Sequence, residues 1–323
     1  MVSRRGQSPE PLARFSALAR EMFRLGHLSD VHLGPVPNLR RRDYVSKRVV
    51  GYANWRRTRT RSMASDTLER LVDDLRAQAP DHIAVTGDLT NIATREEFET
   101  ARAWLEELGP PERVTAIPGN HDAYVPRAHH RFRRLWAPWM ASDDAEFIDK
   151  ALFPFMRRKG HVALIGVSSA VATAPFMATG RVGEGQTRRL CKLLDEAREE
   201  GLFRVILIHH PPKLVDPTSA WRKLTDGKRF RRAIERHGAE LVLHGHEHIR
   251  MTRAIDGPGG AVPVVGVPAG GAMVLGGRRA AGYALYEIAE TNATYELTVI
   301  HRGFGKSGDI AETERTTHSV NRP

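Results

Sequence analysis

Cysteine is almost absent from this chain of 323 residues, and long apolar runs are absent altogether. The one cysteine, Cys191, cannot form a disulfide within the chain, and its place among Leu190, Leu193 and Leu194 is typical of the apolar face of a helix. The first twenty residues have basic side chains but no apolar stretch of signal-peptide length, and no run approaches the roughly eighteen apolar residues of a membrane span. We therefore expect neither export nor a membrane span, and a reducing, cytoplasmic location.

Acidic residues are outnumbered: 38 Asp and Glu stand against 49 Lys and Arg, which gives a formal net charge of +11. Such an excess favours polyanionic or phosphate-bearing partners. The stretch 40–61 holds nine Lys or Arg and one acid, Asp43, together with the aromatic residues Tyr44, Tyr52 and Trp55. Three interpretations of this stretch stay open: a solvated basic face, a peripheral contact with anionic membrane lipids, and a nucleic-acid groove with stacking aromatics.

The order of strand and helix patterns predicts an α/β fold. Apolar spacing of one helical face recurs in 63–79, 95–108, 184–200 and 227–237. Short apolar runs bounded by turn residues lie between these helices, and from Val262 onward such runs follow one another without helices. The expected strands are 22–28, 82–86, 114–117, 161–168, 204–208, 240–243, 262–267, 282–288 and 294–300. Strand and helix alternating in this way is the pattern of an α/β layer protein.

The domain organisation follows from composition. We expect a flexible basic arm at 1–21, a single domain at 22–302 and a polar, frayed tail at 303–323. Two insertions interrupt the domain: the basic insertion 33–62, and a helical insertion at 124–160 that is rich in Arg, His and aromatic residues.

The stretch 117–122 places three polar side chains directly after a short strand-like run. Gly119 allows the backbone to turn sharply there. The amide oxygen of Asn120 can bind a cation, the imidazole of His121 can bind or move a proton, and the carboxylate of Asp122 can orient that imidazole. A loop with a helix-capping Asn and a solvated His would look the same, so other strand ends have to decide between the two interpretations.

Five strand-like runs end in groups suited to metal binding. In α/β sheets, ligands sit outside the carboxyl ends of the strands, so these groups are expected to converge. Asp30 with His32, and His246 with His248, are separated by two residues, which in an extended segment puts both side chains on one side. The five groups are Asp30-Val31-His32, Gly87-Asp88, Asn120-His121-Asp122, His209-His210 and His246-Glu247-His248.

In this order the blocks resemble the signature of the calcineurin-like metallophosphoesterases, which is Asp-x-His, Gly-Asp, Gly-Asn-His-Asp/Glu, His-His-Pro and Gly-His-x-His. The resemblance covers about residues 23 to 300, and the set of motifs is highly specific. It implies two mixed β-sheets in a sandwich flanked by helices, within one domain. The matching blocks here are Ser29-Asp30-Val31-His32, Gly87-Asp88, Gly119-Asn120-His121-Asp122, His209-His210-Pro211-Pro212 and Gly245-His246-Glu247-His248.

The resemblance also implies a centre of two metal ions. By motif position, one metal takes Asp30, His32 and His248, the other takes Asn120, His209 and His246, and Asp88 bridges both. His210 and His244 are the ambiguous neighbours of these positions. Ligands of this mixed kind suit Mn, Fe, Zn or Co without choosing among them.

The implied reaction is attack on phosphorus by a hydroxide that bridges the two metals, with no nucleophilic Ser or Cys. His121 would stabilise the transition state or protonate the leaving oxygen, with Asp122 orienting it. The expected activity is that of a metal-dependent phosphodiesterase acting on a small substrate, such as a cyclic nucleotide or a glycerophosphodiester. How the segments 33–62, 124–160 and 213–226 cover the cleft is expected to set specificity.

Four alternative functions differ in how well they fit the sequence. A lipid-linked or nucleotide-sugar phosphoesterase or pyrophosphatase would use 40–61 to dock on a membrane surface. A nuclease fits the charge, but the sequence has no obvious additional DNA-binding domain. The protein-phosphatase branch is disfavoured because Gly87-Asp88-Leu89-Thr90 lacks that branch's Val-Asp-Arg-Gly continuation. A non-enzymatic scaffold is disfavoured because none of the expected ligand positions is eroded.

Overall fold

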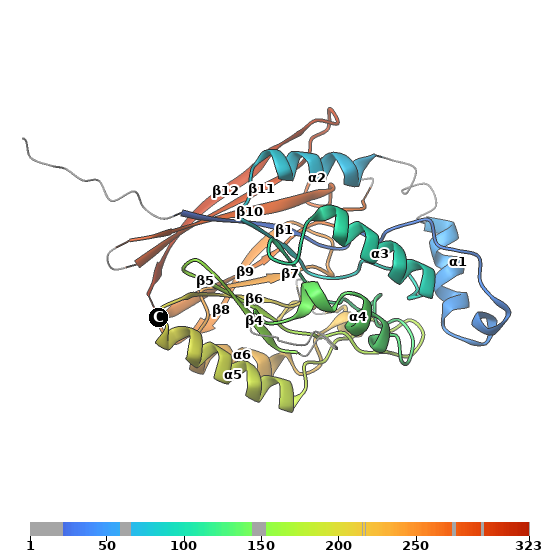
Figure 1. The fold of residues 1–323 in the computed structure, drawn as a ribbon, viewed down its shortest axis with the longest axis horizontal. Coiled ribbons are helices and arrows are strands. Elements are labelled where there is room, and N and C mark those ends of the chain that lie inside the picture. Colours follow the sequence, from blue (N-terminus) through green and yellow to red (C-terminus); the bar gives the residue numbers. More distant parts are fainter. Residues whose placement is uncertain are drawn as a thin grey trace, which may run out of the picture.

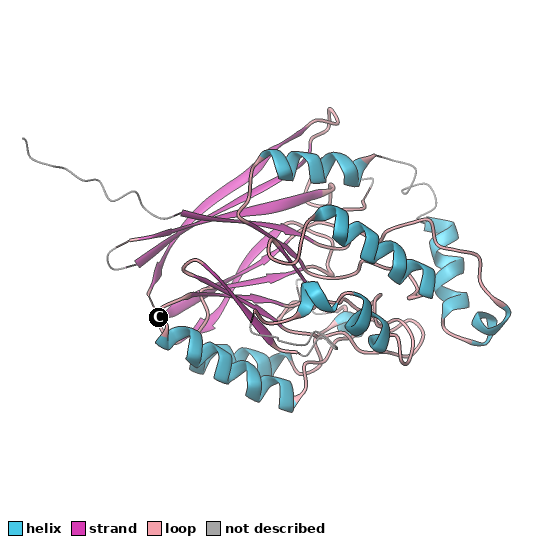
Figure 2. Cartoon of the chain, viewed as in Figure 1, coloured by secondary structure: helices cyan, strands magenta, loops and turns pink. Residues whose placement is uncertain are grey.

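Two six-stranded β-sheets face each other, and helices cover their outer surfaces (Figures 1 and 2). The computed structural model describes residues 22–58, 66–143, 153–214, 216, 218–272, 276–291 and 294–322. The expected arm at 1–21 lies outside the described residues. The predicted fold class, two mixed sheets in a sandwich flanked by helices, is confirmed.

The first sheet has the strand order β12-β11-β10-β1-β2-β3. β1 pairs with β2 in parallel and with β10 in antiparallel orientation, so the sheet is mixed. β1 runs toward the end of the molecule where α1 lies, and β2 and β3 run parallel to it (Figure 1). The strands are β1 Met22–Leu28, β2 His82–Val85, β3 Val114–Ala116, β10 Gly282–Glu290, β11 Thr294–Phe304 and β12 Ile310–Asn321.

The second sheet has the order β4-β5-β6-β7-β9-β8. Its four inner strands are parallel to one another, and β4 and β8 are antiparallel edges. The strands are β4 Phe155–Lys159, β5 Val162–Gly166, β6 Phe203–Leu207, β7 Leu241–His244, β8 Met251–Gly257 and β9 Gly260–Gly266.

Helices cover both outer faces, with α2 and α3 over the first sheet and α5 and α6 over the second (Figure 1). Because successive strand side chains point to opposite faces, Leu164 of β5 joins Leu25 of β1 in the core between the sheets. Its neighbour Ile165 packs with Leu194 and Phe230 in the layer under α5 and α6. The helices are α1 Arg48–Thr58, α2 Thr67–Ala77, α3 Arg95–Leu108, α4 His129–Leu135, α5 Glu184–Glu199 and α6 Gly227–His237.

The start of α3 stabilises the loop that follows β2. The hydroxyl of Thr94 accepts a hydrogen bond from Glu97 N at 3.2 Å, and Glu97 Oε2 accepts one from Thr94 N at 2.8 Å. This reciprocal cap satisfies backbone donors at the helix start. The buried Glu97 carboxylate also accepts a hydrogen bond from Asn91 N at 2.7 Å, which fixes the segment between β2 and the helix.

Two expectations about the chain's organisation are wrong. The tail 303–323 is not frayed, because β11 extends to Phe304 and β12 pairs with it along Ile310–Asn321. β12 is an edge strand whose side chains are mostly exposed, so its sequence lacks the apolar alternation that would have marked it as a strand. The insertion 124–160 is only partly helical, since it ends in the strand β4; residues 144–152 lie outside the described part.

The basic stretch 40–61 folds against the domain as far as the structure describes it. Arg48 Nη1 lies 2.7 Å from Asp43 Oδ1, and its Nε and Nη2 donate to the carbonyls of Ile92 at 3.1 Å and Ala93 at 2.6 Å. Trp55 is buried with Val36. Part of the positive charge therefore anchors α1 to the loop after β2. Residues 59–65 lie outside the described part of the chain.

Removal of residues 309–323 is expected to lower the free energy of unfolding by about 2 kcal/mol, because β12 forms several cross-strand pairs that each contribute roughly 0.2–1 kcal/mol. Denaturant titration measures the change, and a protein that ends at Asn321 serves as the matched control. Equal stability of the two truncated proteins would contradict this prediction and would support the earlier expectation that the tail is frayed.

Candidate metal centre

The carboxyl ends of five strands bring the predicted ligands together at one edge of the sandwich. β1 leads to Asp30 and His32, β2 to Asp88, and β3 to Asn120. The second sheet contributes His209 after β6 and the pair His246 and His248 after β7. The predicted convergence of the five groups is confirmed.

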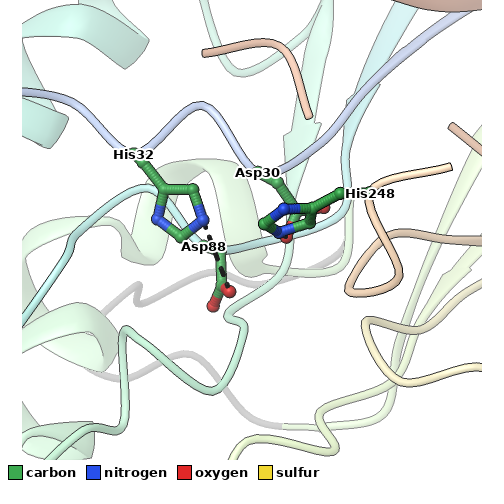
Figure 3. Close-up of side chains that lie close together, drawn as sticks. All are labelled: Asp30, His32, Asp88 and His248. Carbon is green, nitrogen blue, oxygen red and sulfur yellow. Dashed lines mark hydrogen bonds and ion pairs between the residues drawn. The ribbon is translucent and has the colours of Figure 1, made fainter. Parts of the chain in front are cut away.

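The first cluster holds Asp30, His32, Asp88 and His248 (Figure 3). His248 Nε2 lies 3.0 Å from Asp30 Oδ1, and His32 Nε2 lies 3.9 Å from Asp88 Oδ2. One potential ligand atom from each of the four residues falls within 4.8 Å of all the others. The two carboxylates and His32 are buried, so water competes poorly for a cation there.

The second cluster holds Asp88, His209 and His246. His209 Nε2 lies 3.4 Å from Asp88 Oδ2 and 3.0 Å from Asn120 Oδ1. Asp88 thus belongs to both clusters. This is the arrangement of a carboxylate shared between two neighbouring cation sites.

Three of the histidines have fixed ring orientations. The Nδ1 atoms of His32 and His209 face the carbonyls of Thr90 at 3.1 Å and Thr86 at 2.7 Å, and His246 Nε2 faces the carbonyl of Arg222 at 3.0 Å. A carbonyl only accepts, so the nitrogen facing it carries a proton, and the other ring nitrogen is the one that can bind a metal ion. Metal-binding histidines are held in this way, and the donor set fits two transition-metal ions.

The backbone at the site is left-handed at five residues that are not glycine. φ is 53° at Asp30, 45° at His32, 55° at Asp88, 69° at His246 and 51° at His248. Such conformations cost energy and persist where function requires them. These φ values also correct the argument that assumed extended backbone in both pairs. Neither pair is extended. Asp30 and His32 still share a cluster, but His246 and His248 belong to different clusters.

Glycines let the strand ends approach one another closely. A Cβ on Gly87 would lie 2.5 Å from the nitrogen of Gly119, a Cβ on Gly119 would overlap the Asp88 carboxylate, and one on Gly245 would overlap Ser29 and Asp30. The expected role of Gly119 is thereby corrected. Its φ is not in the left-handed region, and a side chain is excluded there by the packing of Asp88.

A family model for calcineurin-like phosphoesterases matches residues 23–250. The chain belongs to this family. The match runs from β1 to the last of the metal-site histidines, so the whole candidate centre lies inside it. The protein is therefore a metallophosphoesterase with two buried His/Asp clusters that suit a dimetal site.

Individual relatives are more distant. A probable cyclic nucleotide phosphodiesterase of Synechococcus is 28% identical over 177 residues, which are 54% of this chain and 60% of that protein. A dimetal phosphatase from Danio rerio superposes with a TM-score of 0.60 at 13% identity, covering 93% of this chain and 99% of that one. A purple acid phosphatase from yellow lupin, Lupinus luteus, also gives 0.60 at 13% identity, covering 94% and 54%. The two solved structures show the shared fold.

The buried carboxylates of the metallophosphoesterase site favour positive charge next to them. Burial opposes ionisation of Asp30, yet the neighbouring His248 holds the pKa of Asp30 well below its ordinary value. Burial likewise opposes ionisation of Asp88, but His209 holds its pKa down. Burial disfavours the protonated form of His209, and the charge of Asp88 nevertheless raises its pKa to about 9. The carboxylates thus hold a proton on a histidine that a metal ion would displace.

Asp122 does not orient His121, contrary to expectation. Its carboxylate accepts hydrogen bonds from the backbone N–H groups of Asp88 at 2.9 Å, Thr90 at 2.9 Å and Gly119 at 2.8 Å. Burial and the charge of Asp88 raise the pKa of Asp122 to about 7, against these hydrogen bonds. Asp122 therefore joins the loops after β2 and β3 behind the metal ligands.

The group that orients His121 is a carbonyl. His121 Nδ1 lies 2.5 Å from the oxygen of Asn91, and His121 N donates to Asp88 Oδ1 at 2.7 Å. The ring stacks on Tyr124 with 14° between the planes and 5.7 Å between the centroids. The sequence contained no signal for Asn91, because its contribution is a backbone atom.

The two ambiguous histidines lie outside both clusters. His210 Nδ1 lies 2.7 Å from Ser169 Oγ, and its Nε2 donates to the carbonyl of Ala178 at 3.1 Å. His244 Nδ1 donates to the carbonyl of Gly245 at 2.9 Å. His210 therefore anchors the loop 169–180 beside the site.

A pocket of about 520 Å³ opens next to His121 and Asn120. Its walls come from α1, Tyr124, the segment 176–178 and Trp221. Segments 33–62, 124–160 and 213–226 each contribute, as expected, but the loop 169–180 was missed. A mid-helix glycine, Gly51, lets α1 lie on this wall, since a Cβ there would sit 2.5 Å from Tyr124 Oη and 2.7 Å from Ile92.

Asp122→Asn is expected to lower the free energy of unfolding by roughly 1–3 kcal/mol, because one carboxylate oxygen becomes an NH₂ group facing backbone donors. Denaturant unfolding measures the loss, with the exposed Asp73→Asn as matched control. A variant that is as stable as the parent protein but slower in turnover would contradict this prediction and would indicate that Asp122 takes part in the reaction.

Proposed function

We propose that this metallophosphoesterase is a metal-dependent phosphodiesterase that hydrolyses a small diester, such as a cyclic nucleotide or a glycerophosphodiester. The observation that carries the proposal is the Asp88 carboxylate shared by two buried His/Asp clusters. A phosphodiester resists attack because its oxygens are negative. Two cations held a few ångströms apart neutralise that charge and lower the pKa of a water molecule.

The chain's own residues would have distinct tasks. Asp30, His32 and His248 would hold one ion, and Asn120, His209 and His246 would hold the other, with Asp88 contacting both. The nitrogen and oxygen donors suit Mn, Fe, Zn or Co. The proposed substrate class rests on the pocket and on the similarity to the Synechococcus protein, a probable cyclic nucleotide phosphodiesterase.

His121 is the proposed proton donor to the leaving oxygen. Its Nδ1 faces the Asn91 carbonyl, so Nε2 is the nitrogen that can exchange a proton with a substrate. The ring borders the pocket and lies 4.8 Å, between centroids, from His32 of the first cluster. A leaving group bound between the cluster and the pocket would be within its reach.

A second candidate is a phosphoesterase for a lipid-linked or nucleotide-sugar substrate at a membrane surface. One observation favours it: large hydrophobic side chains are exposed at the mouth of the pocket. The substrate panel below separates it from the first candidate.

Purified protein reconstituted with Mn²⁺ is expected to bind two metal ions per chain and to hydrolyse diesters faster than monoesters. Metal analysis gives the stoichiometry, and a panel of cyclic nucleotides, glycerophosphodiesters, sugar nucleotides, single-stranded DNA and a phosphomonoester gives the preference. Fewer than one ion per chain would contradict the dimetal centre. Preference for the monoester would contradict the diesterase.

His121→Ala is expected to retain the metals and to lose on the order of 10² to 10⁴ in turnover, because general-acid catalysis contributes about that much. Turnover and metal content are measured on the same preparation, with the exposed His130→Ala as control. Loss of metal together with activity would instead make His121 a ligand.

A further inference from the structure

Large hydrophobic side chains gather at the mouth of the pocket. The exposed ones among the described residues are Met22, Tyr44, Phe176, Met177 and Trp221, and the last three line this single pocket. Phe176 is 80% exposed, Trp221 48% and Met177 38%. We call these three residues the apolar rim. Grouped apolar exposure beside a functional cleft marks an interaction surface.

The exposure of the apolar rim is built into the fold. Lys47 of the basic insertion donates to Thr173 Oγ1 at 3.0 Å and to the carbonyl of Met177 at 3.2 Å. Ala178 N donates to the carbonyl of Trp221 at 2.9 Å, which joins the two rim segments. Phe176 has a left-handed backbone with φ of 64°, a conformation that costs energy for an aromatic residue. The backbone is held while the side chains face outward.

The apolar rim is also connected to the metal site. Arg222 follows Trp221, its guanidinium lies 5.5 Å from the Trp221 ring centroid, and it donates to the carbonyl of His246. The pocket lined by the rim reaches Asn120 and His121 at its inner end. A continuous path therefore leads from the exposed apolar side chains to the reacting position.

Charge identifies the partner. The chain carries a formal net charge of +11, and three cations adjoin the rim: Lys47 donates to Met177, Arg222 lies against the Trp221 ring, and the exposed Lys223 is two residues after Trp221. Aromatic side chains flanked by Lys and Arg are the combination that binds the interface of an anionic bilayer. Nucleic-acid bases could stack on Phe176 and Trp221, whereas the acyl-chain boundary of a bilayer offers an apolar partner to Met177 as well.

We propose that the apolar rim inserts into the surface of an anionic lipid bilayer and seats the pocket mouth on it. The contact is peripheral: the aromatic rings enter the boundary between head groups and acyl chains, and the neighbouring cations meet the lipid phosphates. Among the described residues no helix has the length and apolarity to cross a membrane. The proposal stands independently of which phosphoester the site hydrolyses.

The test uses the full chain loaded with Mn²⁺ and sedimented with two kinds of vesicle, phosphatidylcholine alone and phosphatidylcholine mixed with phosphatidylglycerol. The parent protein is expected to bind the mixed vesicles, and less so as salt is raised. Phe176→Ser combined with Trp221→Ser is expected to reduce partitioning about tenfold. Phe176→Trp is expected to keep it, because tryptophan suits the interface.

Met22→Ser is the matched control, since Met22 is 50% exposed at the start of β1, the end of that strand opposite the site. If the double variant fails to unfold cooperatively, Phe176→Ser alone decides, because that side chain is the most exposed of the three. Absence of binding by the parent protein, or equal binding by the rim variants, overturns the proposal. A dimer that the rim variants abolish, without vesicle binding, also overturns it by making the rim a contact between copies.

Discussion

The shared carboxylate of Asp88 is the constraint on which the site depends. It comes from β2 of the first sheet, yet its nearest imidazole partner, His209, comes from β6 of the second. Two buried, ionised carboxylates at the same edge would be unfavourable without compensating positive charge. The polar end of the sandwich therefore needs compensating cations, whereas a large hydrophobic cluster fills much of the interface between the sheets.

Asp122 plays the complementary part on the far side of Asp88. It collects backbone N–H groups from the loops after β2 and β3, so the two segments that carry Asp88, Asn120 and His121 are held to one another before any ion binds. Burial and the charge of Asp88 raise the pKa of Asp122. The same position that lets Asp122 organise the loops thus places it within the field of Asp88.

The sequence predicts the residues that gather at the site better than it predicts their surroundings. Asp30, His32, Asp88, Asn120, His209, His246 and His248 could be named because metal binding restricts side-chain types and the motifs stand in order. The groups that orient the imidazoles are carbonyls of Thr86, Thr90, Asn91 and Arg222, and a backbone atom leaves no residue preference to detect. The sequence also did not predict β12, because a strand exposed on the sheet edge needs no apolar alternation.

The contact between Gly51 and Tyr124 couples the packing of α1 to the loop that carries His121. The Tyr124 ring stacks on His121, and its hydroxyl end meets α1, with no room for even a methyl group at position 51. A glycine within a helix weakens it by about 0.5–1 kcal/mol. The α1 helix is therefore less stable by itself, but it can approach Tyr124 closely. A side chain at position 51 would therefore displace Tyr124 and, through the stack, the His121 ring.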